Sequence, residues 1–301
     1  MASGGGGEIQ RVQYLPADPR LPEGRPTSKI LGPLRAEGAR GVALAVVSTV
    51  VVLGVLVWLI VRSENWPLVR EAFFNWTEFK DTFPEIVQRF GRNVRFFLIA
   101  EVFILALALL LAVMRSLPGP VFFPIRVMSI IYTDLFRGVP TVLIVYLLAF
   151  GVPSLSMPGV PNDPAFWAVI ALILSYSAYV SEVYRAGIES VHPSQVAAAR
   201  SLGLTRWTTL RHVVIPQAVR RVIPPLLNDF VALQKDTALI AFVVAVPEAF
   251  KMAQIQVAAD FNYTPLLGAA LLFLLITVPL TRTVDWLIAR ERRRRQGGGG
   301  L

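Results

Sequence analysis

Polar and charged residues gather in an otherwise apolar segment near the end of the chain. They are Asn228, Asp229, Lys235 and Asp236. At about 100° per helical residue they share, with Ala232, an arc of about 120°. A charge at the centre of a membrane helix costs roughly 2.5–3.5 kcal/mol, so this arc must face protein or a polar pathway. Lys235 lies deep enough to meet a passing carboxylate.

Four more ionisable residues lie in other apolar segments: Glu101, Asp134, Arg137 and Glu182. Asp134 and Arg137 are one helical turn apart, so we expect them to pair. Glu101 is expected to pair with Lys235 or to contact a substrate. Glu182 lies near the end of its segment, which favours a role in gating or helix docking over ligand contact. These charges either hold the helices together or line a substrate pathway.

Catalytic and metal-binding patterns are absent from the sequence. The chain has no cysteine, which excludes disulfides, cysteine zinc sites and thiol catalysis. His192 and His212 are not spaced as metal ligands, and there is no G-x-S-x-G, H-E-x-x-H or G-x-x-x-x-G-K-[ST] motif. We therefore expect neither an enzyme nor a metal site, and no cofactor held by this chain.

The elements that position these residues are long apolar helices. Hydrophobic residues make up 54% of the chain and charged residues 16%, against roughly 45–50% and about 25% in soluble domains. Apolar runs of about 17–25 residues have the length of a membrane helix, and they lack the alternation of membrane strands. The candidate spans are Gly41–Val61, Val94–Met114, Val127–Phe150, Ala165–Tyr184, Val219–Val246 and Leu266–Ile288. The sequence predicts an all-α integral membrane protein with about six transmembrane helices.

Basic residues predict the orientation of these spans. They are concentrated before the first span, between the fourth and fifth spans and after the last, whereas residues 151–164 have none and residues 247–264 have only Lys251. Residues 62–92 carry more of them than the rule favours. Both termini are expected in the cytoplasm. The net charge of +9 is explained by basic residues beside membrane segments, so nucleic acid is not an expected partner.

The longest predicted cytoplasmic loop contains two short helices. Ser194 is expected to cap a helix over Gln195–Leu202, which Gly203 ends because glycine adopts the left-handed conformation without steric cost. Thr205 is expected to cap a second helix over Arg206–Val214, and Pro216 to stop it. From composition alone, a basic loop held by anionic lipid is the simplest interpretation.

This loop resembles the EAA loop of ABC importer permeases, whose pattern is E-A-A, three residues, Gly, nine residues and I-x-L-P. Ala197–Ala199, Gly203 and Val213–Pro216 stand at the corresponding places. Other motifs, between about Asn93 and Ile288, resemble the polar amino-acid uptake branch. They are Arg137-Gly138-Val139-Pro140, Ser177-Ala178-Tyr179 with Glu182, Gly187–Val191, Ser201-Leu202-Gly203, Pro216-Gln217-Ala218, Pro224-Pro225-Leu226 and Lys235-Asp236-Thr237. The chain departs from the pattern at Ala197 for Glu, Val139 for Thr and Ala238 for Ser.

The resemblance implies a permease subunit that imports a polar amino acid, glutamate or glutamine being the expectation for this branch. It implies a second permease as a homo- or heterodimer, two cytoplasmic ABC ATPase subunits that bind ATP and Mg, an extracytoplasmic solute-binding protein, and the cytoplasmic membrane of a bacterium. It assigns ATPase coupling to Gln195, Ala197, Ala198, Ala199, Arg200, Gly203, Arg206, Trp207 and Pro216.

The expected organisation has five parts. Residues 1–40 form a disordered cytoplasmic tail, 41–62 an extra N-terminal transmembrane helix, 63–92 an extracytoplasmic segment, 93–289 the five-helix permease core with its loop at about 186–216, and 290–301 a basic cytoplasmic tail. The alternative is a secondary transporter or channel for a small polar solute. It is motivated by the intramembrane charges, but it predicts internal repeats or a filter sequence, and neither is present.

Overall fold

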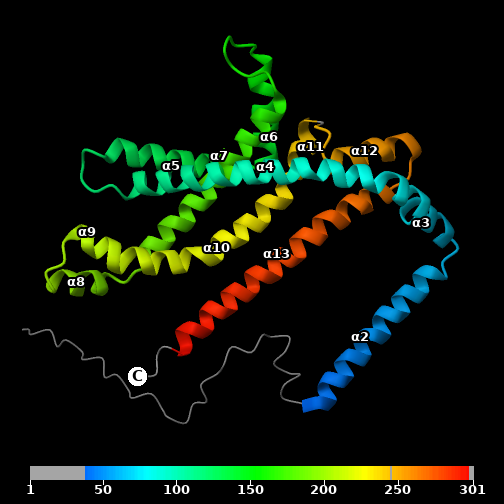
Figure 1. Ribbon diagram of the computed structural model, residues 1–301, viewed down its shortest axis with the longest axis horizontal. Coiled ribbons are helices and arrows are strands. Elements are labelled where there is room, and N and C mark those ends of the chain that lie inside the picture. Colours follow the sequence, from blue (N-terminus) through cyan, green and yellow to red (C-terminus); the bar gives the residue numbers. More distant parts are fainter. Residues whose placement is uncertain (1–37, 245, 298–301) are drawn as a thin grey trace, which may run out of the picture. The chain divides into compact units, whose positions relative to one another are not determined.

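The computed structural model in Figure 1 describes residues 38–244 and 246–297. Over these residues the regular structure is helical and no strand occurs, which confirms the predicted all-α protein. The chain divides into two units, Met1–Trp66 and Pro67–Leu301. The predicted N-terminal tail lies outside the described residues except for its last three positions, which begin the first described helix.

The first unit contains helix α2 (Gly38–Val61). Its side chains are exposed almost throughout, as expected for a helix whose neighbours are lipid chains. Its two adjacent hydroxyl groups are satisfied within the helix: Ser48 donates to the Ala45 carbonyl at 3.0 Å and Thr49 donates to the same carbonyl at 2.7 Å. The stretch Gly41–Val61 is long and apolar enough to cross a membrane, as predicted.

The second unit contains the remaining described helices. In chain order they are α3 (Trp66–Phe73), α4 (Trp76–Ser116), α5 (Phe123–Gly138), α6 (Thr141–Ser154), α7 (Pro164–Glu189), α8 (Pro193–Ser201), α9 (Arg206–Thr209), the π-helical turn η1 (Leu210–Val214), α10 (Ile215–Asp236), α11 (Ala238–Val244), α12 (Ala249–Asp260) and α13 (Thr264–Gly297).

Helix α4 is much longer than the span predicted at Val94–Met114. It begins after Asn75, whose side-chain oxygen accepts from the amides of Thr77 and Glu78, and continues for 41 residues. Its first part, predicted as an extracytoplasmic segment, has an apolar face that packs Ile86 and Phe90 against α12 and α13. That burial explains why the helix continues. The extracytoplasmic location of residues 63–92 stays a prediction.

The predicted third span is a pair of helices, α5 and α6, bent by 102° at their junction. Val139 is extended there, with φ −97° and ψ 132°. A residue before proline is disfavoured in the α conformation, and Pro140 has no amide hydrogen to donate. The chain therefore breaks sharply at this point, inside what was predicted as one continuous span, Val127–Phe150.

Helix α7 is the centre of the second unit, and it packs against α4, α5, α6 and α10. Its buried alanines, Ala168, Ala171 and Ala178, are completely inaccessible and let neighbouring helices approach closely. At Gly187 an added Cβ would lie 2.0 Å from Val222 Cγ2 of α10, so only glycine permits this crossing.

The predicted fifth span ends at Asp236 as α10 and is followed by the short α11. The predicted outside loop 247–264 contains a further helix, α12, which Glu248 caps by accepting from the amides of Phe250 and Lys251. Helix α13 continues to Gly297, so the predicted basic tail from residue 290 extends the last helix rather than leaving it at residue 289.

The number of spans agrees with the prediction at its upper count. Among the described residues, Gly41–Val61, Trp66–Ser116, Pro164–Glu189 and Thr264–Arg290 are each long and apolar enough to cross a membrane. Two bent pairs, α5 with α6 and the stretch Arg206–Val244 with α12, raise the number to six when each pair counts as one span. The N-in, C-in orientation stays a prediction.

Candidate functional site

The loop between α7 and α10 forms a projection built from α8, α9 and η1, located beyond the ends of the two long helices (Figure 1). Helix α8 begins with Pro193 in its first turn, where a missing amide hydrogen has no effect. The N-cap is His192, whose Nδ1 accepts from the amide of Ser194 at 3.2 Å. The prediction of Ser194 as the cap is therefore wrong, because the helix starts two residues earlier than expected.

Gly203 ends α8 in the left-handed conformation, with φ +83°, as predicted. The amide of Leu204 donates to the Ala199 carbonyl at 3.2 Å, and the amide of Gly203 donates to the Arg200 carbonyl at 3.0 Å. This pair of bonds is the Schellman arrangement, which satisfies the last carbonyls of a helix. It fixes the direction in which the chain leaves α8.

The second helix of the projection differs from its prediction. Thr205 caps α9 as expected, with its hydroxyl accepting from the amide of Thr208 at 3.2 Å. The predicted helix over Arg206–Val214 then changes at Leu210 into a π turn, in which the amide of Ile215 donates to the Leu210 carbonyl. Pro216 does not stop the helix, because the wider π turn provides space for the proline ring next to the preceding turn.

The predicted coupling residues are almost all on the outside of this projection. Ala199 is the exception: it is 7% exposed and packs inward. The exposed members are Gln195, Ala197, Ala198, Arg200, Gly203, Arg206, Trp207 and Pro216. Sequence reasoning missed Leu202, which is 84% exposed; Trp207, which it included, is 66% exposed. The projection thus presents apolar and basic groups together, as a surface that docks on another protein does.

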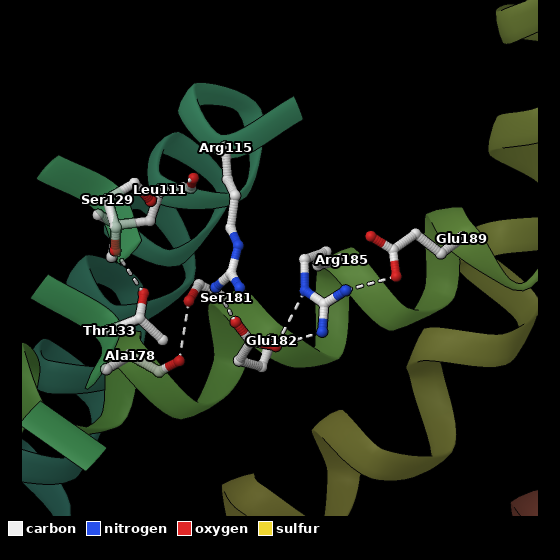
Figure 2. Close-up of polar contacts among 9 residues, drawn as sticks. All are labelled: Leu111, Arg115, Ser129, Thr133, Ala178, Ser181, Glu182, Arg185 and Glu189. Atoms are coloured by element: carbon white, nitrogen blue, oxygen red, sulfur yellow. Dashed lines mark hydrogen bonds and ion pairs between the residues drawn. The ribbon is translucent and has the colours of Figure 1, made fainter. Parts of the chain in front are cut away.

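Glu182 forms the strongest ionic contacts of the site (Figure 2). Its carboxylate accepts from Arg115 at the end of α4 and from Arg185 at 2.7 Å, and Arg185 also binds Glu189. The chain of charges links α4 to the last turn of α7, directly before the projection. A role in helix docking was predicted for Glu182, but its partner Arg115, which lies 67 positions earlier, was missed.

Asp134 and Arg137 do not pair, contrary to the prediction. Both are exposed, and neither forms an ion pair with any residue that the structure describes. Arg137 instead lies over the ring of Tyr179, 5.7 Å from its centroid. The Tyr179 hydroxyl also donates to the Arg137 carbonyl, at 3.4 Å. The last turn of α5, which ends at Gly138, therefore contacts α7 through Arg137, and Arg137 does not reach back to Asp134.

The expected pair between Glu101 and Lys235 is not formed either. The charged neighbour of Glu101 is the carboxylate of Asp229, which repels it. Lys235 is exposed and makes no ion pair within the described part of the chain. The rotation of α10 places Asp229 toward α4 and Lys235 away from the buried side. Asn228 is likewise exposed.

Asp236 is held by a partner that the sequence did not reveal. The hydroxyl of Tyr176 on α7 donates to Asp236 Oδ2 at 2.8 Å. Next to it, Thr277 of α13 donates to Gln234 at 2.8 Å. These bonds fix the end of α10 between α7 and α13.

A second group of polar residues missed by sequence reasoning surrounds the break before α12. Glu248 is completely buried, and Asn93 of α4 is only 1% exposed. Asn93 donates to Thr237 at 3.5 Å and accepts from the amide of Ala249 at 3.4 Å. No usual start signal marks this helix in the sequence, because glutamate is not among the preferred N-cap residues and Pro247 precedes the cap instead of following it.

A polar cavity of about 530 Å³ lies between α5, α7 and α10. Its charged lining residues are Arg137, Glu182, Arg185, Arg221 and Asp229. Arg221 donates to the Ser190 carbonyl at the end of α7. The Oδ2 atom of Asp229 is buried and has no hydrogen-bond partner among the described residues. The structure thus brings together three of the predicted intramembrane charges, Arg137, Glu182 and Asp229, around one space.

Comparison with known proteins gives a consistent result. A family model described as the binding-protein-dependent transport system inner membrane component matches residues 121–293. The probable amino-acid ABC transporter permease protein PatM of Vibrio harveyi is 32% identical over 218 residues, which are 72% of this chain and 96% of that protein. The glutamine transport system permease protein GlnP of Escherichia coli K12 is 31% identical over 166 residues, covering 55% of this chain and 74% of that protein.

A solved structure has the same fold. The crystal structure of an amino acid ABC transporter with histidines superimposes with a TM-score of 0.65 and 28% sequence identity, over 72% of this chain and 98% of that one. The family model covers the projection and every helix that lines the polar cavity.

Proposed function

Since the chain belongs to the family of binding-protein-dependent transport system inner membrane components, we propose that it is the membrane-spanning subunit of an ATP-driven importer for a polar amino acid. The relatives named above are amino-acid and glutamine permeases, and these names support the substrate class. Glutamine or glutamate is the proposed cargo. The chain is a multi-pass membrane protein, and its proposed location is the cytoplasmic membrane of a bacterium.

The projection is the observation that carries this proposal. It joins α7 directly to α10, and the Schellman bonds at Gly203 hold its shape. Leu202 and Trp207 expose apolar surface on it, which is costly in water and is expected to be covered by a partner. A cytoplasmic ATPase is the proposed partner, with one copy for each of two permeases, and both termini of this chain are proposed to lie in the cytoplasm.

Motion of the projection would reach the membrane helices through two contacts. The first is the crossing of α7 and α10 at Gly187 and Val222, where no space is left for sliding. The second is the series from Arg115 through Glu182 and Arg185 to Glu189, which ties α4 to the same end of α7 (Figure 2). Closure of the ATPases would therefore move α4, α7 and α10 together. ATP and Mg are proposed to bind to the ATPase subunits only.

The remaining partners follow from the same proposal. A second permease, a further copy of this chain or a different one, completes the pore, and an extracytoplasmic binding protein delivers the amino acid. The exposed polar side chains of α10, charged Lys235 and neutral Asn228, are groups that a second permease or the substrate would meet, because lipid solvates them poorly.

Reconstitution tests the proposal. The chain is assembled with its cognate ATPase and binding protein in proteoliposomes, and entry of labelled L-glutamine and L-glutamate is measured with and without ATP on the ATPase side. Uptake that requires ATP, the ATPase and the binding protein is expected. Uptake driven by an ion gradient in the absence of the ATPase would instead support a secondary transporter, and the proposal would be wrong.

A further inference from the structure

A narrow groove lies between the start of α10 and the end of α13, on the same side of the second unit as the projection (Figure 1). It has a volume of about 200 Å³. Its lining residues are Arg220, Ile223, Pro224 and Leu227 of α10 and Leu287 and Ile288 of α13. Ile223 is 46% exposed and Leu287 is 39% exposed. Both walls of this α10–α13 groove therefore present apolar side chains to whatever fills it.

Arginine side chains gather at the α10–α13 groove. Arg220 is exposed and lines it. Arg290 is also exposed, and it follows Leu287 by three positions, which places the two residues on the same side of α13. The guanidinium group of Arg290 lies 5.2 Å from the centroid of the Trp286 ring. An apolar groove and a cationic rim thus occur together at the ends of two membrane helices.

The charge near this groove is strongly positive in the sequence as well. Residues 282–295 contain six arginines and two acidic residues, and α10 has no acidic residue before Asp229. A larger apolar groove of about 500 Å³, lined in part by aromatic side chains of α3 and α4, provides the contrast. Beside it, residues 70–81 contain two basic and three acidic residues. An excess of positive charge therefore distinguishes the α10–α13 groove.

We infer that the α10–α13 groove binds an anionic phospholipid, with the phosphate held by Arg220 and Arg290 and an acyl chain between the two helices. Arginine binds a phosphate group through paired N–H donors. Basic pockets between membrane helices on the cytoplasmic side bind anionic head groups, and on the proposed orientation this groove faces the cytoplasmic leaflet. Trp286 is of a residue type that is enriched at the level of the head groups. This ligand is distinct from the cargo of the proposed function.

The site adjoins the base of the projection. The chain passes from η1 directly into α10, and Arg220 lies in the second turn of that helix. The next residue, Arg221, donates to the Ser190 carbonyl at the end of α7. A lipid that contacts α10 and α13 together would hold this base in place. We therefore expect anionic lipid to raise the thermal stability of the chain as well as to bind.

Native mass spectrometry of the purified full-length chain tests the inference. The chain in neutral detergent is mixed with equal amounts of phosphatidylglycerol and phosphatidylcholine that carry identical acyl chains, and the ratio of the bound lipids is measured. A preference for phosphatidylglycerol of at least about tenfold is expected, because each basic residue near the head group contributes about fivefold. Glycerol 3-phosphate in excess, which has the anionic group but no acyl chain, should not displace the lipid. Phosphatidylglycerol should also raise Tm more than phosphatidylcholine does.

Substitutions then locate the site. Arg220→Gln combined with Arg290→Gln should lower the preference at least about fivefold and remove the additional rise in Tm. Arg220→Lys combined with Arg290→Lys keeps both charges and should retain more of each effect. Arg70→Gln combined with Lys80→Gln is the matched control, because it removes the same charge from two exposed residues near the larger groove and should leave the preference unchanged. The Tm of each variant without added lipid checks that it is folded.

Four outcomes would overturn the inference. Three are equal binding of the two lipids, displacement of the lipid by glycerol 3-phosphate, and a preference that the double glutamine variant at Arg220 and Arg290 retains. The fourth is a dimer of the chain that carries no lipid, which would mean that a second copy covers the groove. None of these outcomes affects the proposed function, which ATP-dependent uptake in proteoliposomes tests separately.

Discussion

Substituting Gly187 with alanine should force α7 and α10 apart. The new Cβ would lie 2.0 Å from Val222 Cγ2 and 3.3 Å from the Ala218 carbonyl oxygen. Valine in a helix has one strongly preferred rotamer, so its methyl group does not turn away freely, and the carbonyl is part of the α10 backbone. The clash must be relieved by moving a helix.

The magnitude follows from two opposing terms. Overpacking a buried contact costs about 1–3 kcal/mol, and a contact this short belongs at the upper end. Alanine is about 1 kcal/mol better than glycine inside a helix, which offsets part of the cost. A net loss of about 1–2 kcal/mol in the free energy of unfolding is expected. For a unit of this size it corresponds to a fall of about 2–8 °C in Tm.

The assay is thermal unfolding of the purified chain in nanodiscs at one scan rate. Gly91→Ala is the matched control, because Gly91 is inside α4 and an added Cβ there meets no atom within 4 Å; its Tm should not fall. Val222→Ala removes the clashing methyl group, so the double variant with Gly187→Ala should be less destabilised than the sum of the two single changes. Strict additivity, or an unchanged Tm for Gly187→Ala, would refute the proposed close crossing.

Three other predictions concern the projection and its supports. Gly203→Asp places a side chain in a left-handed conformation and a negative charge at the end of α8, so the chain should still insert but retain less ATPase on co-purification; Gly203→Asn, whose side chain tolerates this conformation, should retain more. Arg115→Gln and Glu182→Gln should each lower uptake per ATP hydrolysed, and the double variant should be no worse than Glu182→Gln alone; additive losses would show that the pair does not act as a unit. Glu248→Ala removes the cap of α12 and should cost about 0.5–2 kcal/mol in unfolding free energy, while Glu248→Gln keeps an acceptor and should cost less; equal losses would contradict the capping role.

Features encoded by neighbouring residues were predicted correctly. The left-handed turn at Gly203 and the cap at Thr205 each depend on a few adjacent backbone units, and the sequence alone specifies them. Chain length and apolar composition were likewise enough for the number of spans. The family motifs also identified the projection as a distinct element.

Pairings between helices were not predictable in the same way. The partners of Glu182 and Asp236 come from α4 and α7, and their choice depends on how each helix is rotated in the bundle. A rotation of α10 that brings Asp229 toward Glu101 removes Lys235 from it, which is why that expected pair is absent. The continuation of the helix past Pro216 was missed for another reason: a π turn leaves no signature in hydropathy.

The π turn at Leu210–Val214 has a consequence for insertions and deletions. A π turn contains one residue more than the α-helical path that it replaces. Removing one residue from it would restore regular α spacing and leave the segments on either side close to their present orientation. Removing one residue from the regular first turns of α10 would instead turn everything before the deletion by about 100° relative to the rest of α10, with a shift of about 1.5 Å. The docking face of α8 and α9 would then point to a different side of the molecule, although every exposed side chain on it would be unchanged. A deletion of one residue is therefore expected to be tolerated better within the π turn than within α10.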